Sequence, residues 1–552
     1  MNREVSTAPM PIAMLQHWAQ QTPDKTYLRQ PRGDHYQEYS WGEVSRQVLS
    51  LAAAFKSLGL ETGDRVVILS ENCAEWFITD FAIQAAGLIS VPIYYTAGKE
   101  TISYIVDHSG ARAVVVGKLA DFSAAQAAIP EQLISIAMPY LTMPCRYQMS
   151  DLLQQHEPLK MPHQPDHQDT FSITYTSGST GKPKGVVLTY RNIMYGGISA
   201  ANLMEQGMQA RVISYLPLAH ITERALIEYS SLYVQAEVTF NHSLDTFLED
   251  LKSARVTFFL SVPRLWLKFQ AGVLSKLPQE RLDILLRIPV ICNLVKRRIK
   301  RQLGLEYVRS CGCGSAPVPP SILQWYARLG IEISEAWGMT ECSGMGTTNF
   351  PFRGEKIGTI GHAMEGLEIK LSEQGEILLR GDAVFKEYYK NPEATAETFT
   401  DDGFMRTGDK AEMDADGYLT ITGRVKDQFK TAKGKYVAPV PLESKLGINQ
   451  LIEQSCVMGA GLPQPVVAIV LSQELTAGLS REEISQSLSA TLASVNAEVE
   501  KHECMGGIYI ASDSWTVENG LLTPTLKIKR AELEQKYSSL ISRITGGEIV
   551  WQ

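Results

Sequence analysis

Residues 175–186 hold the densest set of side chains suited to phosphate chemistry, in the order Tyr-Thr-Ser-Gly-Ser-Thr-Gly-Lys-Pro-Lys-Gly-Val. Glycines allow backbone N–H groups to converge on phosphate oxygens, hydroxyl groups donate further hydrogen bonds, and lysines balance negative charge. The ordinary Walker loop is excluded, because it requires Ser or Thr directly after its lysine and here Pro183 follows Lys182. The segment predicts that ATP is a substrate, although its composition alone also fits a flexible Gly/Ser linker.

The elements before this loop predict an α/β sheet. Apolar residues between Trp41 and Leu58 recur at helical spacing and are followed by a strand at 66–69, and the same alternation continues to a strand at 113–116. Such alternation is typical of a parallel sheet covered on both faces. The loop itself follows an apolar strand at 171–175, and open α/β sheets bind ligands at the carboxyl ends of their strands. This context favours a binding site over a linker.

Length and composition favour several domains and a small-molecule partner. A chain of 552 residues is too long for one compact core. A hydrophobic fraction of 44% fits an ordinary globular protein, and a formal charge of −8 disfavours a general nucleic-acid binder. Neither a signal peptide nor a membrane span can be recognised, which predicts a cytoplasmic protein. The eight cysteines lack zinc-ligand spacing and are interpreted as reduced thiols. The oligomeric state is not indicated.

The character of the sequence changes after Phe399, where the segments 401–403 and 414–417 predict turns between short strands of a smaller, β-rich region. The second segment lacks the acidic spacing and terminal glutamate of a calcium loop, so we interpret it as a hairpin turn. The main domain boundary is expected within 423–427. This placement gives an N-terminal domain of residues 1–425 and a C-terminal domain of residues 426–552.

Five segments together resemble the adenylate-forming superfamily of acyl-CoA synthetases, acyl-adenylating domains and luciferases. They are 175–186, 216–220, 336–341, 406–409 and 423–427. Within the superfamily, 262–266 and 522–530 are most similar to long-chain fatty acyl-CoA synthetases. The resemblance implies a large domain of layered α/β sheets with a smaller, mobile α+β C-terminal domain. It also implies an ATP-dependent fatty acid–CoA ligase for medium to long chains, with Mg²⁺ and coenzyme A.

The implied chemistry has two half-reactions, in which a carboxylate attacks the α-phosphate of ATP and a thiol then displaces AMP from the acyl-adenylate. By the resemblance, the β- and γ-phosphates are held by Thr176, Ser177, Gly178, Ser179, Thr180 and Gly181, with Lys184 nearby. Thr340 would donate to the α-phosphate, and Glu341 with Thr176 would bind Mg²⁺. The alternative for Thr340 and Glu341 is a helix-capping pair.

The resemblance also implies an adenosine site. The segments similar to the adenine pocket contain Ser315, Ala316, Pro317, Glu335, Ala336, Trp337 and Gly338. Trp337 would stack on the base where many relatives carry Tyr, so it retains an aromatic face and lacks the phenolic hydroxyl. The alternative is a tryptophan that fills the core. Asp409 would accept both ribose hydroxyls, assisted by Arg424.

Lys527 is the implied catalytic residue, bridging the attacking carboxylate and the α-phosphate. Most relatives place Gly before this lysine, whereas Leu526 precedes it here and Lys529 lies two residues beyond. An exposed surface lysine is the alternative. If Lys527 leaves after adenylation, the C-terminal domain must rotate, and Lys426 matches the hinge position of the family. Gly434 would let pantetheine approach the backbone closely.

Three further questions stay open from the sequence. His220 matches a position near the acyl channel, and the alternative is a histidine satisfied within the core. The basic segment 296–301 is interpreted as a solvated helix face, with weak peripheral docking on anionic lipid at the inner face of the membrane as the alternative. The competing functions are an enzyme that loads an acyl carrier protein and a regulatory protein that binds nucleotide without turnover.

Overall fold

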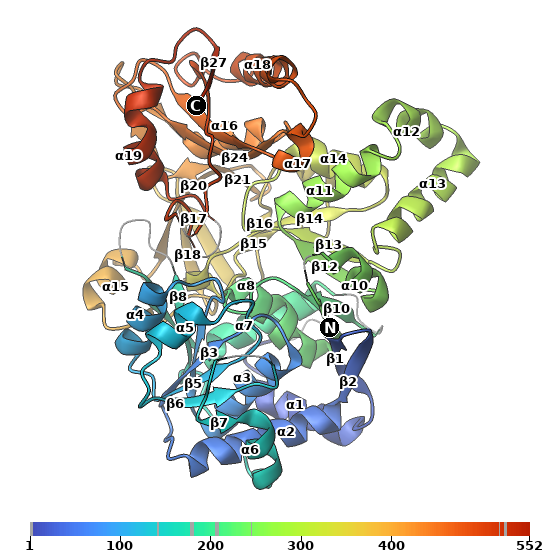
Figure 1. Cartoon of the computed structure of the whole chain (residues 1–552), viewed down its shortest axis with the longest axis vertical. Coiled ribbons are helices and arrows are strands. Elements are labelled where there is room, and N and C mark those ends of the chain that lie inside the picture. Colours follow the sequence, from blue (N-terminus) through green and yellow to red (C-terminus); the bar gives the residue numbers. More distant parts are fainter. Residues whose placement is uncertain are drawn as a thin grey trace.

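The computed structural model describes residues 4–140, 143–176, 182–204, 209–243, 245–517, 519–523 and 527–552. It is a mixed α/β protein with a large N-terminal part and a smaller C-terminal part, which lie at opposite ends of the long axis in Figure 1. The predicted α/β fold class is therefore confirmed.

An eight-stranded sheet forms the centre of the N-terminal part, with the strand order β19-β9-β8-β4-β3-β5-β6-β7. Its strands are β3 (Arg65–Leu69), β4 (Ile89–Ile93), β5 (Ala113–Val116), β6 (Ile134–Ala137), β7 (Tyr147–Gln148), β8 (Thr170–Thr176), β9 (Lys184–Thr189) and β19 (Glu387–Tyr388). The strands from β8 to β7 run parallel, as the alternation predicts, whereas β9 and β19 are each antiparallel to their neighbours.

A second sheet, of order β10-β11-β1-β2, lies on the other side of helix α3 (Ala74–Ala86). Its strands are β1 (Thr26–Arg32), β2 (His35–Ser40), β10 (Arg211–Ser214) and β11 (Glu237–Phe240). All residues of α3 are buried, because the helix contacts β3 and β4 on one side and β1 on the other. The preceding helix α2 (Trp41–Ser57) begins with a capping box of Ser40 and Glu43.

The remaining helices of the N-terminal part cover these sheets or connect them. They are α1 (Pro11–Gln21), α4 (Lys99–Ser109), α5 (Ser123–Ala128), α6 (Met149–Gln155), α7 (Tyr190–Asn202), α8 (Ile221–Glu223), α9 (Ser230–Val234), α10 (Phe247–Ala254), α11 (Pro263–Leu274), α12 (Gln279–Leu286), α13 (Pro289–Gln302), α14 (Pro320–Arg328) and α15 (Pro392–Thr398). A π-helix spans Arg224–Tyr229, and 3₁₀ turns span Thr340–Cys342 and Gly354–Lys356.

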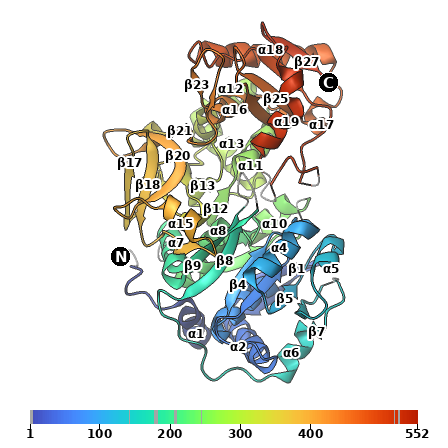
Figure 2. The same ribbon diagram turned by 90° about the vertical axis from the view of Figure 1, so that its left-hand side faces the viewer.

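Two smaller sheets connect this core to the C-terminal part. One contains β12 (Phe258–Ser261), β13 (Ser310–Cys313), β14 (Ile333–Trp337), β15 (Thr347–Thr348) and β16 (His362–Ala363), and the other contains β17 (Leu367–Leu371), β18 (Glu376–Gly381), β20 (Met405–Met413) and β21 (Leu419–Arg424). Figure 2 shows β17, β18, β20 and β21 at one side of the molecule. The predicted turn at 414–417 joins β20 to β21, but the β-rich region begins earlier than predicted, before Phe399.

The C-terminal part contains the sheet β24-β25-β26-β27 and a short ribbon of β22 and β23. Its elements are β22 (Phe429–Lys430), β23 (Tyr436–Val437), α16 (Pro439–Leu446), β24 (Ile452–Met458), β25 (Val466–Leu471), α17 (Gln473–Thr476), α18 (Arg481–Ala497), β26 (Gly507–Ile510), α19 (Arg530–Ile541) and β27 (Glu548–Trp551). Separate apolar cores lie on the two faces of this sheet, one including residues of α16 and α18 and the other residues of α19. Arg264 of α11 forms an ion pair with Glu453 of β24 and so links the two parts.

A fully buried group of charged side chains joins the π-helix to α3 and β8. Arg224 donates to Asp80 (2.7 Å) and to Ser172 (2.9 Å), and the Tyr229 hydroxyl donates to the same carboxylate oxygen of Asp80 (2.5 Å). Neither Arg224 nor Asp80 is exposed to solvent. Burial raises the pKa of Glu228, a neighbour of Arg224, well above its ordinary value, whereas the Arg224 charge lowers it. The group fixes the segment that follows His220.

No helix in the described ranges is long and apolar enough to cross a membrane. All eight cysteines lie in these ranges, and none of them is paired in a disulfide.

Candidate active site

The predicted phosphate loop connects two antiparallel strands. Thr176 ends β8 and is the cross-strand partner of Lys184, the first residue of β9. The predicted position of the loop after a strand is therefore confirmed. Residues 177–181, which include five predicted phosphate ligands, lie outside the described residues. The Lys184 ammonium lies 4.7 Å from the centre of the Tyr388 ring, at the neighbouring strand β19.

Glu341 lies in the 3₁₀ turn Thr340–Cys342, next to this strand pair. Its carboxylate is buried and accepts a hydrogen bond from the Tyr388 hydroxyl (2.8 Å) instead of capping a helix. Burial raises the pKa of Glu341, and the Lys184 charge is among the smaller effects that lower it. The Glu341 carboxylate and the Thr176 hydroxyl are oxygen ligands, which is the kind that Mg²⁺ prefers. The residues present therefore fit Mg²⁺ together with phosphate oxygens.

Trp337 and Asp409, which come from two different sheets, form a hydrogen bond with each other. The indole N–H of Trp337, at the end of β14, donates to one carboxylate oxygen of Asp409 (2.9 Å), and Arg424 Nε donates to the other (2.6 Å). Asp409 and Arg424 are cross-strand partners in β20 and β21, so the sheet itself brings them together. The tryptophan and the two charged residues therefore form one polar group, and the carboxylate retains lone pairs for further donors.

A cavity is lined by Trp337 and by several apolar side chains. Among the predicted adenine-site residues, it is lined by Ser315, Ala336, Trp337 and Gly338, whereas Ala316, Pro317 and Glu335 are absent from its wall. Glu335 instead accepts a hydrogen bond from Gly358 N (2.9 Å), and burial raises its pKa to about 8. The apolar wall consists of Leu203, Leu226, Phe258, Leu260, Met345, Phe350 and Met364. Such a mixed lining can bind a small molecule that has both polar and apolar parts.

Gly338 is needed where β14 passes the next turn. A Cβ atom at this position would lie 2.4 Å from the carbonyl oxygen of Gly344, which is too close for any side chain. The absence of a side chain thus lets the strand that carries Trp337 approach the turn that carries Glu341.

Lys527 reaches this site from the C-terminal part. Loss of surrounding water lowers the pKa of Lys527, the Arg424 charge lowers it further, and the Asp409 and Glu341 charges raise it. Although the residue retains solvent exposure, its ammonium group is therefore close to the charged groups of the site. Lys527 N donates to Thr523 Oγ1 (3.1 Å), and Thr523 N donates to Lys527 O (2.8 Å). These bonds bring Thr523 and Lys527 together, and residues 524–526 between them lie outside the described residues.

His220 lies at the start of α8, on the N-terminal side of the same site. Its Nδ1 accepts a hydrogen bond from Thr222 N (3.1 Å), which caps the helix. Burial lowers the pKa of His220 to about 4, and the positive charge of Lys527 contributes to this shift. The imidazole is therefore neutral at pH 7, and it is close enough to Lys527 for the two groups to interact electrostatically.

The proposed hinge and thiol-site residues lie near the end of the same sheet. Lys426 is exposed and follows β21 by two residues. Gly434 lies in the turn between β22 and β23 with a φ of 77°, a conformation that favours glycine. No contact in the described residues brings Gly434 to the Trp337–Asp409 pair.

A family comparison agrees with this arrangement. The family described as AMP-binding enzyme matches residues 15–389, and the AMP-binding enzyme C-terminal domain matches residues 426–546. The chain is an AMP-binding enzyme. It is 31% identical to a protein named long-chain-fatty-acid–CoA ligase from Mycobacterium bovis, over 97% of each chain. It is 29% identical to the fatty acyl-CoA synthetase A of Dictyostelium discoideum, over 93% of this chain and 86% of the other.

Solved structures share the fold of this AMP-binding enzyme. The anthranilate CoA ligase in complex with anthranoyl-AMP aligns with a TM-score of 0.80 at 21% identity, over 97% of this chain and 99% of the other. The adenylation domain of a carboxylic acid reductase from Segniliparus rugosus, in complex with AMP and a carboxylic acid, aligns with a TM-score of 0.79 at 18% identity. It covers 96% of this chain and 93% of the other.

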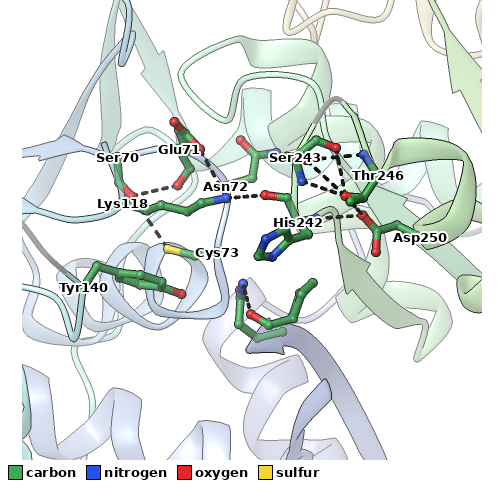
Figure 3. Close-up of polar contacts among 12 residues, drawn as sticks. Ser70, Glu71, Asn72, Cys73, Lys118, Tyr140, His242, Ser243, Thr246 and Asp250 are labelled. Carbon is green, nitrogen blue, oxygen red and sulfur yellow. Dashed lines mark hydrogen bonds and ion pairs between the residues drawn. The ribbon is translucent and has the colours of Figure 1, made fainter. Parts of the chain in front are cut away.

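Sequence reasoning missed several residues that hold the site of this AMP-binding enzyme in place. Asn72 donates to Leu216 O (2.7 Å) and accepts from Leu218 N (3.2 Å), and so fixes the loop before His220. Figure 3 shows Lys118, whose ammonium donates to the carbonyl oxygen of His242 (2.7 Å). Nothing near Asn72 in the sequence indicates its contacts with Leu216 and Leu218.

The loop that carries Lys527 has an equally unexpected anchor. Arg530, the first residue of α19, donates to both carboxylate oxygens of Glu443 in α16 (2.8 and 3.0 Å) and to Val457 O (2.7 Å). The side chains of Arg530 and Glu443 are each 15% exposed, so the pair is largely shielded from water. Arg530 belongs to the basic end that resembled long-chain synthetases, but Glu443 carries no motif. The pair fixes the start of α19, three residues after Lys527.

Proposed function

We propose that this protein is an ATP-dependent fatty acid–CoA ligase that forms acyl-CoA of medium to long chain through an acyl-adenylate. The observation that carries the proposal is the cavity lined both by Trp337, which donates a hydrogen bond to Asp409, and by a set of apolar side chains. The relatives named as fatty acid–CoA ligases, which align over nearly the whole chain, support the same activity. Adenylate-forming CoA ligases use ATP, Mg²⁺ and coenzyme A.

In the first half-reaction, Trp337 stacks on adenine. Asp409, which Arg424 holds in place, accepts hydrogen bonds from the ribose hydroxyls. Backbone N–H groups and hydroxyls of residues 176–181, together with Lys184, bind the β- and γ-phosphates, and Thr340 donates to the α-phosphate. Glu341 and Thr176 would hold Mg²⁺, which supplies positive charge to the phosphate oxygens. Each fixed donor favours the transition state, because negative charge moves toward the pyrophosphate as the carboxylate attacks.

Lys527 places its ammonium between the attacking carboxylate and the α-phosphate. The neutral His220 beside it lies near the acyl carboxylate, where an imidazolium would repel the lysine. We place the domain boundary between residues 425 and 426. In the second half-reaction, rotation about Lys426 removes Lys527 and brings Gly434 toward the entering pantetheine. A few residues at a domain boundary can absorb such a rotation.

An acyl carrier protein in place of free CoA is the competing acceptor. It is favoured by one neighbour in fold, a didomain of the Segniliparus carboxylic acid reductase described as A-PCP, which aligns with a TM-score of 0.80. Its 18% identity to this chain supports only the shared fold. The relatives that align over both domains at higher identity bear CoA-ligase names, so CoA is the acceptor that we propose.

The test is a substrate panel with purified protein, ATP and Mg²⁺, in which C2 to C20 and aromatic acids are offered with CoA. We expect acyl-CoA and AMP in equal amounts, highest for medium to long chains. An Asp409→Asn variant provides the control, because it keeps the shape of the ribose site and loses its charge. Adenylate that accumulates until a carrier protein is added would favour the competing acceptor. Absence of AMP release with every acid would contradict the proposed function.

A further inference from the structure

Helices α12 and α13 form a hairpin, residues 279–302, that extends away from the rest of the N-terminal part, as Figure 1 shows at its right-hand side. Its base is well anchored. Leu282 and Ile299 are buried at 1% and 4% exposure, and Asp283 forms an ion pair with Arg328 of α14. Lys300 donates to Gly330 O. The hairpin is therefore a firmly attached projection whose outer surface is not required for packing.

The outer end of this hairpin is apolar. Val290, Leu294 and Ile284 are 74%, 65% and 59% exposed, and Ile288 and Ile291 are 41% and 37% exposed. Single exposed apolar residues are normal on a protein surface, but five large ones are concentrated within residues 284–294, on the two helices and the turn that joins them. Such a patch marks an interaction surface, because each exposed side chain carries an unfavourable contact with water.

The hairpin is also basic, in contrast to the rest of the chain. Residues 279–302 contain seven Lys and Arg residues against two acidic residues, whereas the whole chain has a formal charge of −8. On α13, Val290 and Leu294 are followed at helical spacing by Arg297, Arg298 and Arg301, so one face of the helix is apolar at the outer end and basic toward the body. Glu306 lies near Arg297 (3.6 Å) and Arg301 (3.1 Å) and neutralises part of this charge.

We propose that the 279–302 hairpin docks on an anionic lipid surface. The apolar end enters the interface between headgroups and acyl chains, and the arginines nearer the body lie at the level of the lipid phosphates. This order of apolar and basic residues matches an anionic bilayer, in which negative charge surrounds an apolar interior. The docking rests on the hairpin alone and is independent of the proposed function.

Flotation with vesicles tests this directly. Wild-type protein should bind vesicles of phosphatidylcholine with phosphatidylglycerol, and bind neutral phosphatidylcholine vesicles at least tenfold more weakly. Binding should also weaken at high salt, because the basic contribution is screened. No binding to anionic vesicles, or equal binding to neutral ones, would overturn the proposal.

Two variants separate the apolar and basic contributions. Val290→Glu with Leu294→Glu should reduce binding more than tenfold, and Arg297→Ser with Arg298→Ser about fivefold for each arginine. Met161→Glu is the matched control, because Met161 is 78% exposed and lies outside the hairpin. It should bind as wild type does. All variants should keep wild-type melting temperatures and activity on a short, water-soluble acid.

A second copy of the chain is the other occupant to be tested. If light scattering shows a wild-type dimer that Val290→Glu with Leu294→Glu converts to a monomer, while vesicle binding is unchanged, the patch is a dimer interface and the lipid proposal is wrong. Equal vesicle binding by wild type and by both hairpin variants would also contradict it.

Discussion

Replacing Lys527 by alanine should separate the two half-reactions of the proposed ligase. Lys527 comes from the C-terminal part. Glu341, whose charge raises the pKa of Lys527, and His220, whose pKa Lys527 lowers, come from the N-terminal part. By the proposed rotation, its ammonium leaves the site after adenylate formation. Adenylate formation needs this charge, and attack of the thiol on a finished adenylate does not.

The expected magnitude follows from the role of a fixed donor. Removing one group that stabilises developing negative charge typically costs about 3–4 kcal/mol of barrier, or a factor of about 10²–10³. Lys527→Ala should slow adenylate formation by that factor and change thioester formation from synthetic acyl-adenylate by less than about threefold. Lys529→Ala is the matched control, because Lys529 lies two residues away in the same basic segment. Its backbone N–H donates to Leu521 O (3.0 Å) and its carbonyl oxygen accepts from Leu533 N (3.2 Å), and alanine keeps both bonds.

The assay measures each half-reaction separately. Exchange of labelled pyrophosphate into ATP reports adenylate formation, and release of AMP from synthetic acyl-adenylate with CoA reports the second half. Equal losses of both halves in Lys527→Ala would refute the assigned role. A larger loss in Lys529→Ala than in Lys527→Ala would show that the two lysines had been assigned the wrong way round.

Three further changes address other parts of the structure. Trp337→Phe keeps the stacking face but loses the bond to Asp409, so the KM for ATP should rise about tenfold, as steady-state kinetics would show. Burial raises the pKa of Glu341, and Mg·ATP binding needs its ionised carboxylate. Binding should therefore weaken as the pH falls through that raised pKa. Calorimetry at several pH values should show this dependence in the wild type and its loss in Glu341→Gln. Arg224→Met should lower the free energy of unfolding in urea by about 3–5 kcal/mol, and adding Asp80→Asn should restore part of it.

Local patterns were enough to predict much of the fold. The alternation of helical and extended periodicity predicted β3 and β5 nearly to their observed ends, because each element buries a face that its own residues specify. The pairing of β9 with β19 could not be predicted, since it joins residues about 200 positions apart that carry no turn signal. The β-rich region was expected to begin after Phe399, whereas its first strands, β17 and β18, lie before that residue. The pairing of β18 with β20 is also a tertiary contact that the local pattern does not indicate.

The site divides in the same way. Trp337 and Asp409 were assigned to one nucleotide site from separate motifs, and they lie in hydrogen-bonding contact. Glu335 was grouped with the adenine residues by the resemblance, but its carboxyl group accepts a hydrogen bond from Gly358 N, a contact that no local pattern indicates. Tyr388 and Glu443, which hold Glu341 and Arg530, belong to no motif. Their contributions depend on tertiary contacts, which no local pattern contains.

The interior charges around Arg224 restrict how this chain can diverge. Any single replacement of Arg224 or Asp80 leaves a charge without a partner away from water, so nearly every one-step change is selected against. A combined exchange of both for apolar residues of similar volume can match the original stability. Homologues should therefore carry either both Arg224 and Asp80 or neither of them. Mutant libraries that change one codon at a time would score both positions as invariant, although the pair can be replaced together.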